Sequence, residues 1–209
     1  MADYTEDEPR LVAIYDDLNG GRWDHDFYFS QLPKSPQYVA DIGCGTGAFA
    51  VRLAEAGHRV IGLDPSNAML DFARNRPGAD AVSWLSGIAK VLPDGPFDSA
   101  VMMGHAFQCL ISDAAILETL CAISSRLTAQ GKFMFESRNP SAKAWLGWNS
   151  AEDSPSVSET SAGRIEECYS VFSVDNELVD FGCRTKFDSD GAEIVERATF
   201  RFISAARLA

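Results

Sequence analysis

The chain has 209 residues, of which 46% are hydrophobic and 23% charged, as in an ordinary globular protein of about one domain. Its formal net charge of −12 repels phosphate groups, which argues against nucleic acid or a membrane surface as partner. We find neither an apolar run long enough to span a membrane nor a secretory signal. The five cysteines are odd in number and lack C-x-x-C spacing, so we expect reduced thiols, no metal site and a cytoplasmic protein.

Short apolar runs alternate with helically spaced segments through the first two thirds of the chain. The first helical segment is 11–18, and later ones begin at Ala48, after Ser66 and after Ser112. The last of these carries Leu117, Leu120 and Leu127 and ends at Gln130-Gly131. The predicted strands are 38–42, 59–63, 81–85, 97–103 and 132–136. This order predicts an α/β fold: a Rossmann-like, open, mainly parallel sheet with helices on both faces and right-handed crossovers, formed by residues 1–140.

The pattern changes after Pro140. Residues 141–163 are rich in Ser, Glu and Thr, which favours a loop or lid. Three alternating runs follow at 165–174, 178–187 and 194–203, separated by turn-forming residues. They predict a C-terminal antiparallel β meander with one buried face, an extension of the same domain over residues 164–209.

The strongest chemical signal is Asp41-Ile42-Gly43-Cys44-Gly45-Thr46-Gly47, a buried strand that ends in a glycine-rich turn before a helix. Asp64 lies 21 positions after Gly43, the separation at which an acid can accept hydrogen bonds from ribose hydroxyls. The glycines also fit the dinucleotide pattern, or serve only close packing of helix on strand. Asp41 favours a ligand with a positive group, because a carboxylate repels pyrophosphate.

These residues resemble the class I S-adenosylmethionine-dependent methyltransferases, in particular their bacterial small-molecule branch. The segments 60–66, 97–103 and 131–135 strengthen the resemblance, which covers residues 11–140. It implies S-adenosyl-L-methionine as cofactor and direct transfer of a methyl group to O or N of a small-molecule acceptor. Such a displacement depends on alignment of the reactants and needs no enzyme nucleophile.

The resemblance also implies a cofactor site. Its expected members are Asp41, Gly43, Cys44, Gly45, Gly47, Asp64, Pro65, Met69, Ile88, Ala89 and Gly104. The loop residues would surround the methionine part, Asp64 the ribose and Met69 the adenine. Many relatives have Gly-Asp-Ala where this chain has Gly87-Ile88-Ala89, so the side-chain acceptor for the adenine amine is absent, and Ser86 or a water could replace it.

Candidate acceptor-site residues follow the strand ends. His105 is interpreted as a base or orienting residue, with a packing role as the alternative. The expected substrate-binding residues are Tyr15, Phe107, Gln108, Arg138 and Asn139. A salt bridge is the alternative for Arg138. Five aromatic residues could cap the pocket or pack on the sheet: Trp23, Phe27, Tyr28, Trp145 and Trp148.

Two other functions stay open at this point. One is an NAD(P)-dependent Rossmann oxidoreductase. The other is a shortened cofactor-binding protein without turnover, because relatives usually continue past Ser204 with another helix and two strands. The fifth strand would then be a sheet edge covered by the meander or by a partner, for example in a homodimer.

Overall fold

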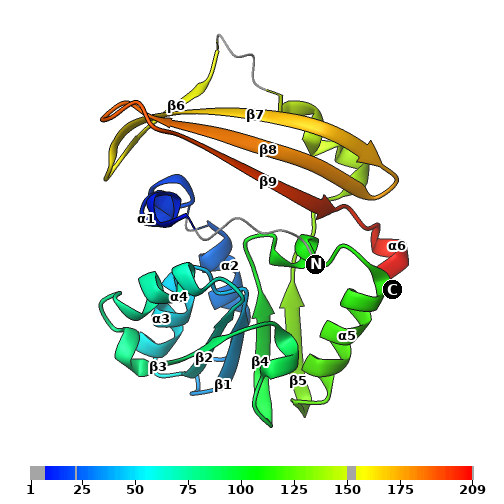
Figure 1. The fold of residues 1–209 in the computed structure, drawn as a ribbon. Helices are drawn as coiled ribbons and strands as arrows, with labels where there is room; N and C mark the ends of the chain where they lie inside the picture. The colour runs from blue at the N-terminus through cyan, green and yellow to red at the C-terminus, as the bar shows by residue number, and fades with distance from the viewer. Residues whose placement is uncertain (1–7, 22, 150–153, 209) are drawn as a thin grey trace. The chain divides into compact units, whose positions relative to one another are not determined.

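Residues 8–21, 23–149 and 154–208 are described by the structure, a computed structural model. The chain divides into two compact units (Figure 1). The α/β unit comprises Gly21–Phe107 and Ser112–Glu136, and the meander unit comprises Met1–Gly20, Gln108–Ile111 and Ser137–Ala209. The expected core of residues 1–140 differs from this division, because the N-terminal helix belongs to the meander unit.

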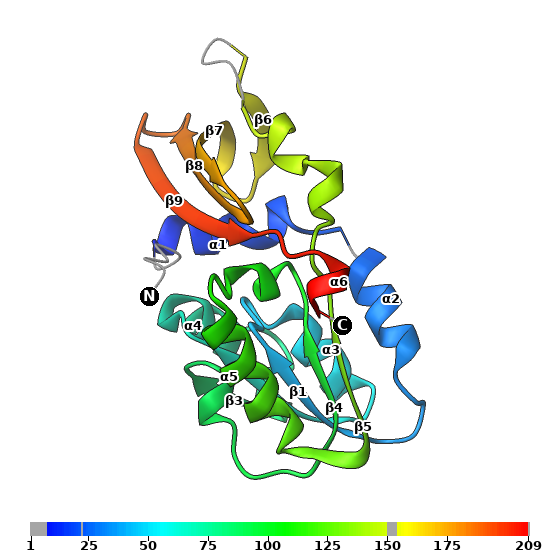
Figure 2. The ribbon, with the colours of Figure 1, turned by 90° about the vertical axis from the view of Figure 1, so that its right-hand side faces the viewer.

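The α/β unit contains the predicted five-stranded parallel sheet, and its strand order is β3-β2-β1-β4-β5. Its strands are β1 (Tyr38–Ile42), β2 (Arg59–Asp64), β3 (Val82–Ser86), β4 (Phe97–Met102) and β5 (Leu127–Phe135). Its helices are α2 (Trp23–Gln31), α3 (Ala48–Glu55), α4 (Asn67–Arg74) and α5 (Asp113–Ser124), with short 3₁₀ turns η1 (Ala79–Ala81) and η2 (Ala89–Val91). Figure 2 shows α3 and α5 on opposite faces of the sheet. The 3₁₀ turn η3 (Ala106–Cys109) crosses the boundary between the units.

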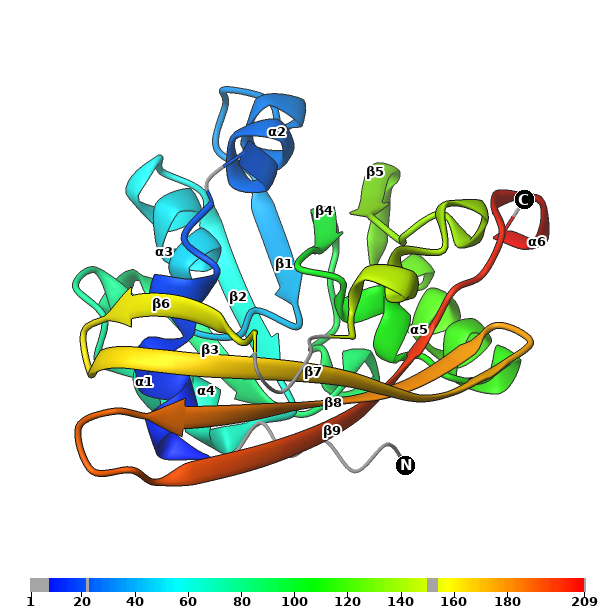
Figure 3. The same ribbon diagram turned by 90° about the horizontal axis from the view of Figure 1, so that it is seen from above.

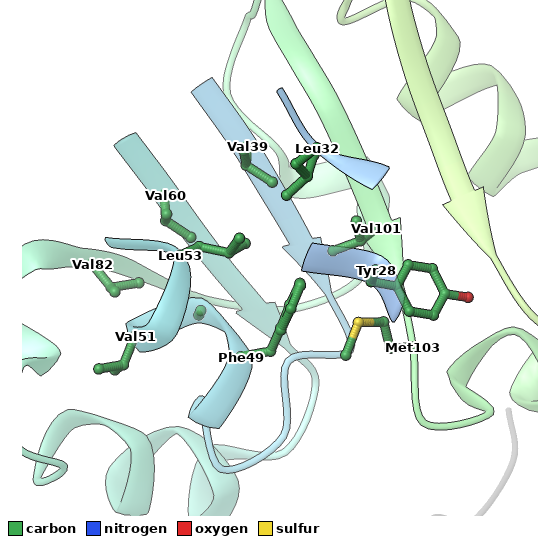
Figure 4. Close-up of a cluster of buried hydrophobic side chains, with 11 residues drawn as sticks. Tyr28, Leu32, Val39, Phe49, Val51, Leu53, Val60, Val82, Val101 and Met103 are labelled. Atoms are coloured by element: carbon green, nitrogen blue, oxygen red, sulfur yellow. The ribbon is translucent and has the colours of Figure 1, made fainter. Parts of the chain in front are cut away.

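One face of the parallel sheet carries a hydrophobic core cluster of the α/β unit (Figure 4). Four valines, one from each of β1 to β4, form its floor: Val39, Val60, Val82 and Val101. Leu53 from α3 and Tyr28 from α2 pack on them with less than 5% of their surface exposed. Burying a side chain such as Leu53 contributes about 1.5–3 kcal/mol. Helix α2 was not predicted, because its apolar residues are split between the core and solvent: Trp23 and Phe27 are 78% and 57% exposed.

The prediction for residues 113–136 was wrong in its boundaries. Helix α5 ends at Ser124, and Leu127 begins β5 instead of ending the helix. Leu127 pairs with Phe97, whereas Lys132 already pairs with Ser99, so β5 contains extra residues between the two pairs. Gly131 therefore lies in an irregularity of the strand and does not terminate a helix. No described strand pairs with the other edge of β5, because the meander forms a separate sheet.

The meander unit contains a four-stranded antiparallel sheet in the order β6-β7-β8-β9 (Figure 3). Its strands are β6 (Ser156–Thr160), β7 (Gly163–Asp175), β8 (Leu178–Phe187) and β9 (Glu193–Arg201). The remaining elements are α1 (Pro9–Leu18), α6 (Ala205–Leu208) and the 3₁₀ turns η4 (Pro140–Ala142) and η5 (Ala144–Gly147). The prediction of a meander is confirmed, with one strand more than expected.

Strand β6 corrects the expectation that residues 141–163 form a loop or lid. It pairs along its length with β7, from Ser156↔Glu167 to Thr160↔Gly163. Its composition is too polar to signal a strand, and the pairing stabilises it through backbone hydrogen bonds. Residues 150–153 of the expected loop lie outside the described residues.

Helix α1 packs on the buried face of the meander. Ile14 forms a fully buried cluster with Ile165 and Phe187. At one end of the helix, the guanidinium of Arg10 pairs with the Asp190 carboxylate at 3.0 Å. These contacts explain why the N-terminal segment belongs to the meander unit. None of the described helices is long and apolar enough to cross a membrane.

Candidate functional site

The glycine-rich loop follows β1 and is tied to the end of β2. The backbone N–H groups of Gly43 and Cys44 both donate to the carbonyl oxygen of Leu63, at 2.7 and 3.0 Å. Gly43, Gly45 and Gly47 have φ angles of 72°, 52° and 77°, in the left-handed region that favours glycine. Residues 43–47 therefore require glycine at these three positions to make the turn into α3.

The four glycines of this region differ in what surrounds them. A Cβ on Gly43 would lie 2.7 Å from Cβ of Ala106, and one on Gly47 would lie 2.4 Å from the Trp84 ring. A Cβ on Gly45 or Gly104 would meet no atom within 4 Å. Gly43 and Gly47 thus permit close packing, whereas Gly45 and Gly104 border open space that a ligand can approach. Both interpretations of the glycines therefore apply, close packing to Gly43 and Gly47 and ligand access to Gly45 and Gly104.

Two carboxyl groups lie beside the loop. Asp64 Oδ2 accepts a hydrogen bond from the Gly45 N–H at 2.8 Å, and Oδ1 accepts one from the Ser66 N–H at 2.9 Å. Asp41, at the end of β1, is 2% exposed. Its Oδ2 atom is buried and has no hydrogen-bond partner among the described residues. Burial, and secondly the negative charge of Asp64, raise the pKa of Asp41 to about 7.

This arrangement suits a positively charged ligand. A buried carboxylate without a partner is costly, and a cation placed beside it removes that cost. The Cys44 thiol adds no negative charge, because burial and the two aspartates raise its pKa well above its usual value. A pyrophosphate at the same place would face two carboxyl groups. The two carboxyl groups therefore suit the ammonium group of S-adenosylmethionine and disfavour the pyrophosphate of a dinucleotide.

The expected adenine-side residues lie around α4 and η2. Ser66 caps α4, its Oγ accepting from the Met69 N–H at 3.1 Å, and Met69 is 3% exposed. Pro65 is exposed. Ile88 is 52% exposed, whereas Ala89 is buried at the start of η2. The Ser86 hydroxyl, considered as a substitute acceptor for the adenine amine, donates to Asn67 Oδ1 at 2.9 Å.

His105 follows β4 in a left-handed conformation, with φ of 66°. Its backbone N–H donates to Glu136 Oε1 at 3.1 Å, and its Nδ1 atom lies 4.0 Å from the same oxygen. The Tyr28 hydroxyl donates to Glu136 Oε2. Sequence reasoning placed Glu136 only as the last residue of a strand. An acid at the carboxyl end of a strand next to His105 was the signal that could have identified it.

The expected acceptor-site residues fall in both units. Phe107 is 1% exposed and stacks on Phe135, with ring centres 4.2 Å apart, in the α/β unit. Gln108 is fully buried in the meander unit, where its side-chain amide donates to the Arg201 carbonyl at 3.2 Å. Arg138 donates to Gln108 Oε1 at 3.0 Å. A common acceptor pocket formed by these residues stays a prediction.

The two other expected acceptor-site residues, and the tryptophans, also belong to the meander unit. Tyr15 is half-buried in α1. The Asn139 side chain accepts from the Ser141 N–H at 3.0 Å and caps η4. Trp145 packs against Phe202, with ring centres 4.7 Å apart, and Trp148 packs against aromatic side chains of β8 and β9. These contacts agree with the packing alternative for both tryptophans.

The site has a glycine-rich turn, a buried acid with one unpartnered oxygen and a second acid at the end of the next strand. Together they define a cofactor site of the nucleoside type on a Rossmann-like sheet. Residues 39–131, which contain all of these groups, match the family described as methyltransferase domain. Over this segment the chain is similar in sequence to methyltransferases, and its fold is similar to that of solved S-adenosylmethionine-dependent methyltransferases.

Three comparisons illustrate this. The chain is 30% identical to YqeM of Bacillus subtilis (strain 168) over 133 residues, which are 60% of this chain and 53% of the relative. A solved S-adenosylmethionine-dependent methyltransferase from Clostridium acetobutylicum is similar with a TM-score of 0.72 and 17% identity, over 95% of this chain and 83% of the other. CalS10 of Micromonospora echinaspora, an amino pentose methyltransferase solved with bound cofactor, is similar with a TM-score of 0.69 and 17% identity, over 93% and 84%. The chain spans about half or less of the length of the curated relatives it matches.

Proposed function

We propose that this protein transfers the methyl group of S-adenosylmethionine to a nitrogen or oxygen of a small-molecule acceptor. The observation that carries the proposal is the buried, unpartnered Oδ2 atom of Asp41, which precedes a glycine-rich loop in which Gly45 borders open space. The family match over residues 39–131 supports the same cofactor.

In this proposal each group beside the loop has a distinct role. Asp41 and the backbone of residues 43–47 bind the amino-acid part of the cofactor, and Asp64 binds the ribose hydroxyls. Asp64 already accepts two backbone N–H groups, and each carboxylate oxygen has a second lone pair for a hydroxyl. When bound, S-adenosylmethionine supplies a methyl group on a positively charged sulfur. The chain's contribution is to align an acceptor with that methyl group, which can lower a barrier by about 7–11 kcal/mol.

A small acceptor is favoured over a macromolecule. The net charge of −12 opposes the binding of RNA or DNA. The similarity to CalS10, an amino pentose methyltransferase, supports an amine or hydroxyl of a small molecule as the acceptor class. We place the enzyme in the cytoplasm on the pattern of its cysteines.

Calorimetry with S-adenosylmethionine, S-adenosylhomocysteine and NAD tests the cofactor assignment. We expect binding of the first two and none of NAD. The acceptor class is tested with methyl-labelled S-adenosylmethionine and a panel of amino sugars, amino acids and phenols, with labelled product separated from cofactor. Absence of binding by both sulfur compounds would reject the proposal, and binding without transfer to any acceptor of the panel would favour a cofactor-binding protein without turnover.

A further inference from the structure

We propose that Glu136 is a positioning residue of this methyltransferase, which holds the imidazole of His105 ready to take the proton that the acceptor loses. The inference rests on the proposed function, since it names how that site handles the proton. Glu136 and His105 follow β5 and β4, two neighbouring parallel strands in which Phe135 pairs with Met102. Their side chains therefore emerge at the same edge of the sheet.

Glu136 accepts a hydrogen bond from the His105 backbone, and its carboxylate lies near the imidazole ring. The Oε1 atom accepts the His105 N–H at 3.1 Å, which stabilises the left-handed conformation of a residue that is not glycine. The same oxygen lies 4.0 Å from Nδ1. At that separation a carboxylate favours the protonated imidazole, and it does so more strongly here than in bulk water because both side chains are about two-thirds buried.

Tyr28 holds the other carboxylate oxygen. Its hydroxyl donates to Glu136 Oε2, and Figure 4 shows the ring at the border of the hydrophobic core with the hydroxyl pointing away from the aliphatic side chains. Burial, and then the Glu136 carboxylate, raise the pKa of Tyr28 far above its usual range, with a smaller effect from Asp24. The phenol thus stays protonated and continues to donate. Glu136 is held at both oxygens, by His105 after β4 and by Tyr28 of α2.

This cluster borders the proposed cofactor site. Ala106, the residue after His105, lies close to Gly43. A Cβ on Gly43 would be 2.7 Å from the Cβ of Ala106. Gly104, the residue before His105, borders open space. His105 therefore lies in the sequence between Ala106, which packs close to the cofactor loop, and Gly104, which borders open space.

The proposed step balances as follows. The acceptor's lone pair forms a bond to the methyl carbon while the carbon–sulfur bond breaks, and its electron pair stays on sulfur to give the neutral thioether. The acceptor's N–H or O–H proton passes to the His105 imidazole. Glu136 stabilises the imidazolium that forms, as a carboxylate does for a histidine base.

The test uses the intact, cofactor-free protein and NMR titration of its three histidines. Glu136→Gln keeps an oxygen for the His105 N–H and removes the charge, so we expect the titration midpoint of the His105 ring to fall by about one pH unit. Two controls are expected to leave it within about 0.3 units: Glu118→Gln, which removes a carboxylate paired with Lys90 on the surface, and Tyr28→Phe, which keeps the charge of Glu136. The proposal is overturned if the His105 midpoint falls by less than about 0.3 pH units in Glu136→Gln, or if it falls by the same amount in Glu118→Gln.

Two further measurements separate positioning from damage and from the proposed function. Calorimetric affinity for S-adenosylhomocysteine is expected to stay within about twofold in Glu136→Gln. A loss above about fivefold would show that Glu136 acts through the cofactor loop, and would overturn the proposal. With an acceptor from the panel, the acidic limb of the kcat/KM profile should move to lower pH with the NMR midpoint. If the wild type methylates no acceptor, the proposed function fails, while the NMR titration still decides whether Glu136 controls His105.

Discussion

The buried carboxyl of Asp41 couples the stability of the protein to pH. Its pKa is about 7, against an ordinary value of 3.8 for aspartate, so folding favours the protonated form by about 4 kcal/mol at most. Below pH 4 the group is protonated in both states and costs nothing. As the pH rises to 7 the unfolded chain loses the proton first, so the fold loses up to about 4 kcal/mol, and above pH 7 the loss is constant.

Asp41→Asn removes this titration while it preserves the shape of the side chain. We expect the variant to match the wild type in stability at pH 4 and to exceed it at pH 8 by up to about 4 kcal/mol. Urea unfolding at half-unit pH intervals measures the difference. Asp71→Asn, which removes an exposed acid paired with Arg74, is the matched control. It should not change how the free energy of unfolding varies with pH.

The same substitution is expected to act in the opposite direction on the cofactor. S-adenosylmethionine should bind more tightly to the wild type at pH 8 than at pH 5, because the ionised Asp41 attracts a cation, and it should bind weakly to Asp41→Asn at both. If the variant keeps the wild-type pH dependence of stability between pH 4.5 and 7.5, the assignment of a buried, destabilised carboxyl is refuted.

Three further substitutions test the site and its support. Asp64→Ala is expected to weaken S-adenosylhomocysteine binding by about 1–3 kcal/mol in calorimetry, the scale of a hydrogen bond to a charged group; an unchanged affinity would remove Asp64 from the site. Gly47→Ala should lower the melting temperature more than Gly45→Ala, because its Cβ would lie 2.4 Å from the Trp84 ring, whereas Gly45→Ala should reduce cofactor affinity more; the reverse order would contradict the roles given to the two glycines. Leu53→Ala should cost about 2–5 kcal/mol in urea unfolding, and a cost below about 1 kcal/mol would mean that α3 is not fixed by this core.

The cofactor loop could be predicted because its signals are local. Asp41, the three glycines and Asp64 lie within 24 residues of the sequence, and each acts through its own backbone conformation or its place at a strand end. The same holds for α3, whose bounds follow from an apolar face between Gly47 and Gly57. The strand runs of β1, β2 and β4 are mostly apolar, as buried parallel strands are.

Contacts between distant segments decided the rest. Strand β6 exists because β7 supplies its hydrogen bonds, and the start of β5 at Leu127 is set by pairing with Phe97. The Tyr28–Glu136 hydrogen bond joins residues 108 positions apart, and neither residue carries a pattern that names the other. Local preference determines which segments become helix or strand and where a tight turn falls. Only packing in three dimensions determines which strand edges pair and which polar side chains meet, because the free energy of those contacts depends on partners that are remote in the chain.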